Sequence, residues 1–325
     1  MMRPNSHRFA MPVAVHNKVM MSSKPSVAER KSTRENILLS VLLLFVIGAW
    51  GANYVVTKIA IRTNGPWAFN AFRYSLAAVL LAAWLCHQKG WRSLMPARGE
   101  FGRIVLVGLL QISLITSSTN WALTHIDANR TILIAYSMPI WALFFGFFLS
   151  RDLVNLKSVI SVVLGFGGLA LFCAPWSMDW TSYDALAGSG AALLGAAGWA
   201  LGAVLYRRFV WTSSLGQQIF LQVLAAAVAA LLCASAFEQR PLVLDMQYGL
   251  IVLYNALVPT ILAFWFWAKI LTLIPASTAG QFVLLSPIVG ILLGSLVLGE
   301  AITPMLIVSA ALILGGALLA YIKRN

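Results

Sequence analysis

The amino-acid sequence predicts an all-α integral membrane protein with ten transmembrane helices, arranged as two inverted five-helix repeats. Hydrophobic residues make up 60% of the 325-residue chain and charged residues only 10%, whereas soluble domains carry about 25% charged residues. The apolar residues lie in uncharged runs of about 20 residues, long enough for a helix to cross ~30 Å of hydrocarbon. The third observation is an internal repeat.

The stretch 128–171 resembles the stretch 276–319. The uncommon residues match in one register: Pro139 with Pro287, Gly146 with Gly294, Asp152 with Glu300, Ser161 with Ser309, and Gly167-Gly168 with Gly315-Gly316. Leucine matches would mean little in so apolar a chain, but these residue types rarely coincide by chance. The pattern therefore indicates an ancestral duplication.

Hydropathy places the individual spans. They are expected at residues 37–61, 67–87, 102–124, 130–150, 157–174, 185–207, 215–236, 248–271, 278–298 and 304–322. The first repeat then covers 37–175 and the second 185–323. Because each repeat has an odd number of spans, the second must enter the membrane from the opposite side. Inverted repeats are an architecture of secondary transporters, whose substrate site lies near the bilayer midplane where the repeats meet.

The positive charges indicate the orientation. Residues 1–36 are polar and basic, and we expect a disordered cytoplasmic tail there. The joints on the same side as this tail hold most of the remaining Lys and Arg, while the opposite side holds only Arg62, Arg130 and Arg240. The positive-inside rule places both termini in the cytoplasm, and we expect the spans to lie in the cytoplasmic (inner) membrane. The net charge of +13 is thus expected to face anionic lipid rather than nucleic acid.

Acidic residues are missing from all ten predicted spans. A proton antiporter for cationic drugs needs a carboxylate inside the membrane, so we expect transport without obligatory proton coupling. The three cysteines form no CxxC motif and no His lies near them at metal-ligand spacing. No motif of a hydrolase, metalloprotease or phosphate-binding loop occurs. The sequence therefore predicts no metal, no cofactor and no enzymatic activity.

Uncharged polar and aromatic residues near the middle of the spans are the candidate substrate-binding residues. They are Trp50, Asn53, Gln111, Ser118, Tyr136, Trp199, Tyr206, Asn255 and Gln281. Together they would form a neutral, ring-lined pocket suited to a zwitterion with an apolar side chain, because aromatic faces attract an ammonium group. For each of them the alternative is a hydrogen bond between helices.

Arg73 and three prolines complete the candidates. Arg73 lies well inside the second predicted span, where an arginine costs ~2.5–3.5 kcal/mol. It is expected either to pair with a substrate carboxylate or to hold helices together. Pro139, Pro259 and Pro287 interrupt helical hydrogen bonding within spans and are candidate hinges, with a packing kink as the alternative.

Several of these features together resemble a known family. They are Trp50-Gly51, the run 73–76 (RYSL), the run 122–126 (ALTHI), and the Pro139 helix with its acidic turn. In order and spacing they resemble the EamA-type branch of the drug/metabolite transporter superfamily, over residues 37–322. Within it the chain looks most like bacterial exporters of amino acids, including YddG-type aromatic amino acid exporters. The resemblance implies export of a small metabolite by alternating access.

The chain departs from this pattern at two places. The second repeat has Leu221 where Arg73 stands in the first, and the joint between the eighth and ninth spans holds Leu273-Ile274-Pro275 in place of a polar turn. The alternatives to amino acid export are proton-coupled export of another metabolite or drug class, a channel, a membrane sensor and a lipid scramblase. Because the duplication supplies both halves of a pathway, we expect a functional monomer.

Overall fold

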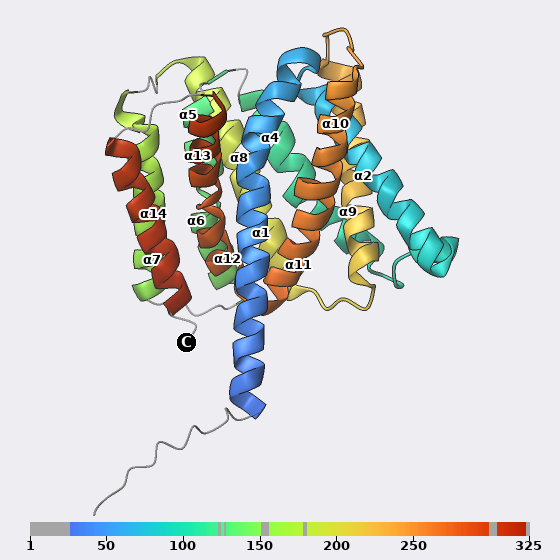
Figure 1. The fold of residues 1–325 in the computed structure, drawn as a ribbon, viewed down its shortest axis with the longest axis horizontal. Helices are drawn as coiled ribbons and strands as arrows, with labels where there is room; N and C mark the ends of the chain where they lie inside the picture. Colours follow the sequence, from blue (N-terminus) through green and yellow to red (C-terminus); the bar gives the residue numbers. More distant parts are fainter. Residues whose placement is uncertain are drawn as a thin grey trace, which may run out of the picture. The chain divides into compact units, whose positions relative to one another are not determined.

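The computed structural model describes residues 27–122, 125–126, 128–150, 156–177, 181–298 and 304–322. Within these ranges every regular element is helical (Figure 1). Seven helical segments are long and apolar enough to cross a membrane. Shorter apolar helices at Leu156–Leu171, Ala276–Gly290 and Ile307–Leu319 cover the other predicted spans. The prediction of an all-α membrane protein is confirmed.

The first repeat contains five spans, two of which are divided. Its elements are α1 (Val27–Asn64), α2 (Pro66–Lys89), η1 (Trp91–Leu94), α3 (Phe101–Gly108), η2 (Leu109–Leu114), α4 (Ile115–Ala122), α5 (Ala128–Ala135), α6 (Met138–Phe145), η3 (Gly146–Ser150), α7 (Leu156–Cys173) and η4 (Pro175–Ser177). Residues Met1–Leu38 and Leu39–Asn325 separate into two units, and the sites described below lie in the second.

The start of α1 differs from the sequence prediction. The helix begins at Val27, inside the stretch 1–36 for which disorder is expected. Ala28, Glu29, Arg30 and Lys31 are all strong helix formers, so the helix continues into the basic tail. Residues 1–26 lie outside the described part of the chain.

The second repeat follows the same order. Its elements are α8 (Tyr183–Arg208), α9 (Leu215–Phe237), α10 (Met246–Asn255), η5 (Ala256–Leu262), α11 (Ala263–Leu273), α12 (Ala276–Val283), α13 (Ser286–Leu298) and α14 (Pro304–Ile322). A capping box starts α9: the Ser214 hydroxyl accepts from the Gln217 backbone N–H, and the Gln217 side chain accepts from the Ser214 N–H.

The candidate hinges lie at interruptions of the helices. α5 ends at Ala135 and α6 begins at Met138, with Pro139 in its first turn. The matching break separates α12 from α13, which begins at Ser286 and Pro287. A first turn tolerates proline because its N–H groups have no helical acceptor. Pro259 lies inside η5, a π-helical stretch, so spans that the sequence predicts as single runs are divided at all three prolines.

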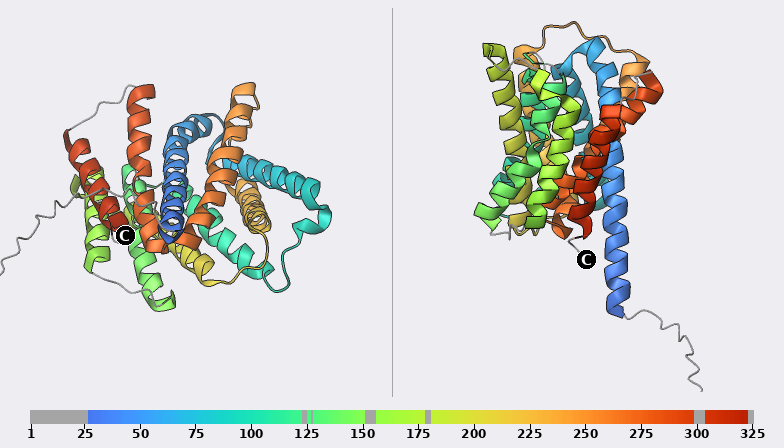
Figure 2. Two further views of the ribbon diagram at one scale, coloured as in Figure 1. Left: turned by 60° about the horizontal axis from the view of Figure 1, so that its bottom comes forward. Right: turned by 90° about the vertical axis from the view of Figure 1, so that its left-hand side faces the viewer.

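The fifth helices of the two repeats, α7 and α14, pack along each other (Figures 1 and 2). The Ser161 hydroxyl donates to the Gly316 carbonyl at 2.7 Å. A Cβ at Gly168 would lie 2.7 Å from the Ser309 carbonyl oxygen, and a Cβ at Gly316 2.7 Å from that of Ser161. The contacts across the crossing are therefore reciprocal: the serine of each repeat lies against the second glycine of the other repeat's Gly-Gly pair. These small residues allow the two backbones to approach closely.

The second helices, α2 and α9, also pack along each other, and a buried carboxylate ties their ends at one face. Glu100, between α2 and α3, accepts hydrogen bonds from the Thr212 N–H at 2.7 Å, the Thr212 hydroxyl at 2.6 Å and the Ser213 N–H at 3.1 Å. Burial raises the pKa of Glu100, but these bonds outweigh it and lower the pKa to about 2. The charged Glu100 thus fixes the start of α9.

Glu238 makes the corresponding connection at the other end of the pair. It follows α9 and its carboxylate accepts from the Ala68 N–H in the first turn of α2 at 3.1 Å, where the helix dipole favours an anion. Gly65 precedes this turn with φ of +72°, and a Cβ there would lie 2.5 Å from the carboxylate oxygens. Each repeat therefore supplies one acid that holds the second helix of the other repeat.

Candidate substrate site

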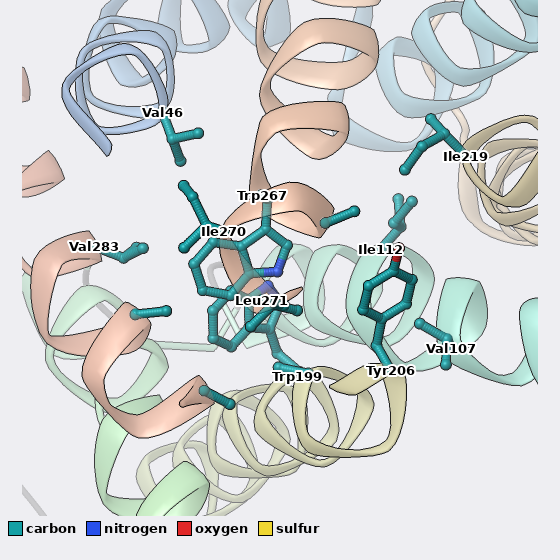
Figure 3. Close-up of a cluster of buried hydrophobic side chains, with 14 of the residues drawn as sticks. Val46, Val107, Ile112, Trp199, Tyr206, Ile219, Trp267, Ile270, Leu271 and Val283 are labelled. Carbon is teal, nitrogen blue, oxygen red and sulfur yellow. The ribbon is translucent and has the colours of Figure 1, made fainter. Parts of the chain in front are cut away.

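An aromatic cluster joins the two repeats. The ring of Trp50 on α1 lies 6.5 Å from that of Trp199 on α8, 5.7 Å from Trp267 and 5.6 Å from Phe264 on α11, between centroids. Trp199 and Trp267 are 4.8 Å apart at an interplanar angle of 34°, and Figure 3 shows their indole rings facing each other. Such pairs contribute about 0.5–1.5 kcal/mol each beyond burial. We call these four residues the aromatic cluster.

Two rings of the cluster are buried and two are partly buried. Trp199 is 4% and Trp267 1% exposed, whereas Trp50 and Phe264 are partly buried. The Trp50 indole N–H donates to the Pro259 carbonyl at 3.1 Å. Pro259 carries no N–H and lies in the π-helical η5, where helical hydrogen bonding is irregular. The tryptophan predicted from the first span is thus hydrogen-bonded to the proline predicted from the eighth.

Polar atoms with no hydrogen-bond partner are buried on α1, α10 and α11. They are Oδ1 of Asn53, Oδ1 of Asn255 and Nε1 of Trp267. The Asn255 amide nitrogen donates to the Ile251 carbonyl at 3.1 Å, within its own helix. A buried polar atom without a partner costs about 1–3 kcal/mol, and each such atom calls for an explanation such as water or a ligand. These helices therefore offer hydrogen-bonding capacity that the protein itself leaves unused.

Two further candidate residues lie along α8. The Gln111 side chain on η2 covers Gly202, where a Cβ would lie 2.6 Å from Cγ of Gln111, and its Nε2 is buried without a partner. Ser118 on α4 is buried and packs against Gly195. In both contacts a side chain of the third span packs against a glycine of the sixth span, which leaves room for the two helices to lie close together.

Tyr206 lies away from the aromatic cluster, and Tyr136 lies beside a helix break. The Tyr206 hydroxyl donates to Oε1 of Gln218 at 2.8 Å, and its ring stacks on Trp211 at 5.3 Å; Figure 3 shows it apart from the two indoles. Tyr206 therefore makes the bond between helices that the sequence analysis gives as the alternative. Tyr136 is buried beside the break between α5 and α6.

Gln281 also lies outside the aromatic cluster. It is 2% exposed and sits against α7, where a Cβ on Gly165 would lie 3.1 Å from its Oε1. Neither its amide oxygen nor its amide nitrogen has a partner. The neighbouring Gly280 packs against Pro139, so α12 meets the candidate hinge of α6.

Arg73 packs on aromatic rings. Its guanidinium carbon lies 4.4 Å from the ring centroid of Tyr74 and 5.5 Å from that of Phe69. One of its terminal nitrogens donates to the Tyr74 hydroxyl, which in turn pairs with the Thr116 hydroxyl at 3.0 Å. These contacts link α2 to α4 and match the structural alternative of the sequence analysis.

Sequence reasoning missed Trp267 and Phe264. Both belong to the run 264–267 (FWFW), and consecutive positions of a helix point in different directions around it. Trp265 indeed faces the other way and contacts Trp84 on α2 at 5.5 Å. The richness in aromatic residues was a signal, but only the packing of α11 against α1 and α8 selects two of the four.

Comparison with known proteins identifies the family. A model of the EamA-like transporter family matches the chain at residues 37–174 and again at residues 186–322. The chain belongs to the EamA-like transporter family. This EamA-type protein is therefore a multi-pass membrane transporter of the drug/metabolite transporter superfamily, and the resemblance inferred from the sequence is confirmed.

Curated relatives of this EamA-type protein carry transporter names. It is 26% identical over 284 residues to the "Uncharacterized transporter YoaV" of Bacillus subtilis, covering 86% of this chain and 94% of that protein. It is 23% identical over 292 residues to a "Probable amino-acid metabolite efflux pump" of Escherichia coli, covering 85% and 92%. A crystal structure with 20% identity matches at a TM-score of 0.75, covering 88% of this chain and 97% of that one, which supports the fold.

Proposed function

We propose that this EamA-type protein exports small neutral metabolites, above all neutral and aromatic amino acids, from the cytoplasm by alternating access. The observation that carries the proposal is the aromatic cluster, because Trp50 comes from the first repeat and Trp199, Trp267 and Phe264 from the second. Aromatic faces bind both an apolar side chain and an ammonium group. The unpaired Nε1 of Trp267 adds a hydrogen-bond donor for a carbonyl or carboxylate oxygen.

The aromatic cluster fits a transporter whose two halves move against each other. Its rings meet at α1, α8 and α11, and the bond from Trp50 to Pro259 in η5 crosses from one repeat to the other. Displacement of α1 from η5 and α11 would break that bond and open the space between the rings to substrate. The name of the efflux-pump relative from Escherichia coli, which is 23% identical to this chain, supports an amino-acid-derived substrate.

The direct test is counterflow in liposomes. Purified protein is reconstituted into vesicles loaded with excess unlabelled phenylalanine, leucine, a sugar, a nucleotide sugar or a cationic dye, and entry of trace radiolabelled phenylalanine is followed. We expect transient accumulation of label with phenylalanine or leucine inside, saturable in external substrate. A linear, non-saturable flux would indicate a channel. The substrate class would be overturned if labelled phenylalanine did not accumulate in any vesicle while a labelled sugar or the dye accumulated in vesicles loaded with that same compound.

Vesicles doped with a fluorescent lipid provide the control for the remaining alternative. If the protein moved the lipid between leaflets at the same rate with and without amino acid, and no counterflow occurred, a scramblase would replace the transporter of small metabolites proposed above. We expect lipid movement no faster than in protein-free vesicles.

A further inference from the structure

The joint between α2 and α3 displays several positive charges at one face of the bundle. Residues 89–103, which we call the basic joint, contain four cations and a single acid. The cations are Lys89, Arg92, Arg98 and Arg103, and all four are exposed. Figures 1 and 2 show the end of α2 at the outer edge of the bundle. The positive-inside rule predicts that this face is cytoplasmic.

Large apolar side chains are exposed between these cations. Trp91 is 67%, Met95 64% and Phe101 57% exposed. The guanidinium carbon of Arg92 lies 5.7 Å from the ring centroid of Trp91. Aromatic rings and arginines side by side at the end of a membrane helix are typical of the level where lipid tails meet head groups.

Hydrogen bonds hold the backbone of the basic joint in place. The Ala97 N–H donates to the Ser213 hydroxyl oxygen at 2.8 Å, and the Gln217 amide nitrogen donates to the Met95 carbonyl at 2.7 Å. Both partners lie at the start of α9 and the loop before it. The Ser93 hydroxyl donates to a carbonyl of α2 at 2.8 Å. The exposed side chains therefore project from an ordered backbone, which lowers the entropy cost of binding a ligand.

The single acid of the basic joint does not face outward with the cations. Glu100 is 5% exposed, and its carboxylate accepts hydrogen bonds from Thr212 and Ser213 of the other repeat. The exposed ionisable groups of the joint are therefore all positive. An anionic partner is favoured at this surface.

The second repeat provides a comparison at the other end of the α2 and α9 pair. The stretch 237–251 takes the place of the basic joint, because α9 ends at Phe237 as α2 ends at Lys89. It also exposes apolar side chains, with Leu244 68% and Met246 79% exposed, but it holds two acids and one cation. Exposed apolar groups are thus common to both joints, whereas an excess of positive charge belongs to the joint predicted to face the cytoplasm. Anionic lipids of the cytoplasmic leaflet attract such basic segments.

We propose that the basic joint binds the head groups of anionic phospholipids in the cytoplasmic leaflet, with Arg92 and Arg98 on phosphate oxygens and Trp91 and Phe101 among the first carbons of the acyl chains. Guanidinium groups suit this role because they can bind two phosphate oxygens at once. A nucleic acid or an acidic protein in the cytoplasm would bind only the cations, whereas a lipid covers both kinds of side chain. The site does not depend on which substrate the protein exports.

Native mass spectrometry of the purified full-length protein in detergent measures this binding, with dioleoyl phosphatidylglycerol and dioleoyl phosphatidylcholine added in equal amounts. The two lipids have the same acyl chains and differ in the charge of the head group. We expect wild type to retain phosphatidylglycerol preferentially. Arg92→Gln/Arg98→Gln should reduce that preference about tenfold. Arg103 stays in place because its guanidinium carbon lies 5.4 Å from the ring centroid of Phe209, so its loss would disturb packing as well as charge.

The matched control removes two exposed cations from other helices. Lys157 on α7 and Lys269 on α11 are exposed and lie at ends that the positive-inside rule also predicts as cytoplasmic. Lys157→Gln/Lys269→Gln changes the net charge as much as Arg92→Gln/Arg98→Gln and should keep the wild-type preference. If the arginine variant fails to fold, Arg98→Gln alone compared with Lys157→Gln alone supplies the same test.

Equal retention of the two lipids by wild type, or equal preferences in the two double variants, would overturn the lipid site. Glycerol 3-phosphate carries a phosphate without acyl chains and should not displace phosphatidylglycerol. Displacement would assign the arginines to a free phosphate compound instead. Binding of polyglutamate to wild type in place of phosphatidylglycerol would likewise replace the lipid with an acidic protein.

Discussion

At the scale of single residues, the aromatic cluster makes the sharpest prediction, because α11 carries two nearby tryptophans with different surroundings. Trp267 contacts Trp50 and Trp199, whereas Trp265 contacts Trp84 on α2. Trp267→Phe removes the unpaired indole N–H and part of the ring face, so we expect the KM for phenylalanine counterflow to rise about tenfold, equivalent to ~1.4 kcal/mol. Trp265→Phe is the control and should keep the wild-type KM. Equal effects in the two variants would argue against the cluster as the substrate site.

For Arg73 we expect an effect on stability rather than on KM, because its contacts join parts of the protein to each other. The guanidinium lies over Tyr74 and Phe69, and such an interaction is worth about 0.5–2 kcal/mol. Arg73→Gln should therefore lower the thermal midpoint of the purified protein while the KM per folded molecule stays unchanged. Tyr74→Phe, which removes the hydroxyl between Arg73 and Thr116, should produce a smaller loss of the same kind. A raised KM with unchanged stability would instead assign Arg73 to the substrate carboxylate.

At the scale of the elements, the close packing of α7 against α14 can be tested by substitution in their Gly-Gly pairs. In each pair one glycine lies against the other helix and its neighbour does not. A Cβ at Gly168 would lie 2.7 Å from the Ser309 carbonyl oxygen and one at Gly316 2.7 Å from that of Ser161, while Gly167 and Gly315 have nothing within 4 Å. Overpacking of this kind costs about 1–3 kcal/mol. Gly168→Ala and Gly316→Ala should lower the thermal midpoint.

The neighbouring glycines are the matched controls for this crossing. Gly167→Ala and Gly315→Ala should leave the midpoint unchanged or raise it slightly, because alanine is the better helix former. If all four variants behaved alike in a thermal unfolding assay, the close approach of α7 and α14 would be disproved.

Glu100, in the loop between α2 and α3, should make the stability of the protein depend on pH. Glu100 has a folded-state pKa of about 2, below its ordinary value of 4.5. Its contribution is therefore fully present above pH 4.5 and is lost as the pH falls toward 2. Glu100→Gln should destabilise the protein by about 2 kcal/mol at neutral pH, because hydrogen bonds to a charged acceptor are lost.

Thermal unfolding of wild type and Glu100→Gln across pH 3 to 7 checks this prediction. The difference in thermal midpoint between wild type and Glu100→Gln should be constant above pH 4.5 and should become smaller below it. A constant difference down to pH 3 would show that the carboxylate charge is not what holds Thr212 and Ser213.

The repeat and the spans could be predicted from the sequence because they rest on rare residues and long apolar runs. Ser161, Ser309 and the two Gly-Gly pairs match in register, and the structure brings matched residues into contact. The direction of a single side chain could not be predicted in the same way. Gln281 points toward Gly165 rather than toward Trp50, because α12 packs against α7 on that face, and in a membrane both faces of a helix are apolar.

The prolines predicted where the helices are interrupted, but the form of each interruption escaped prediction for a related reason. A proline in an apolar run predicts an interruption, but whether it begins a new helix or enters a π-helical stretch depends on which neighbour accepts the freed hydrogen bonds. Pro139 and Pro287 begin α6 and α13, while the Pro259 carbonyl receives the indole N–H of Trp50. The donor Trp50 and the acceptor Pro259 belong to different repeats, so no local sequence pattern connects them.

At the scale of the whole molecule, the absence of acids from the predicted spans bears on the energy source of transport. Two of the acids between the helices, Glu100 and Glu238, are each hydrogen-bonded to the opposite repeat, and with its pKa near 2 Glu100 stays charged at physiological pH. Neither is available as a proton carrier within the membrane.

Amino acid efflux from proteoliposomes should therefore run down the substrate gradient at the same initial rate with and without a pH gradient of one unit, and a protonophore should leave it unchanged. A proton-coupled transporter reconstituted in the same lipid is the control and should respond to both. Loss of efflux on collapsing the pH gradient would show that another group of the protein carries a proton with each substrate.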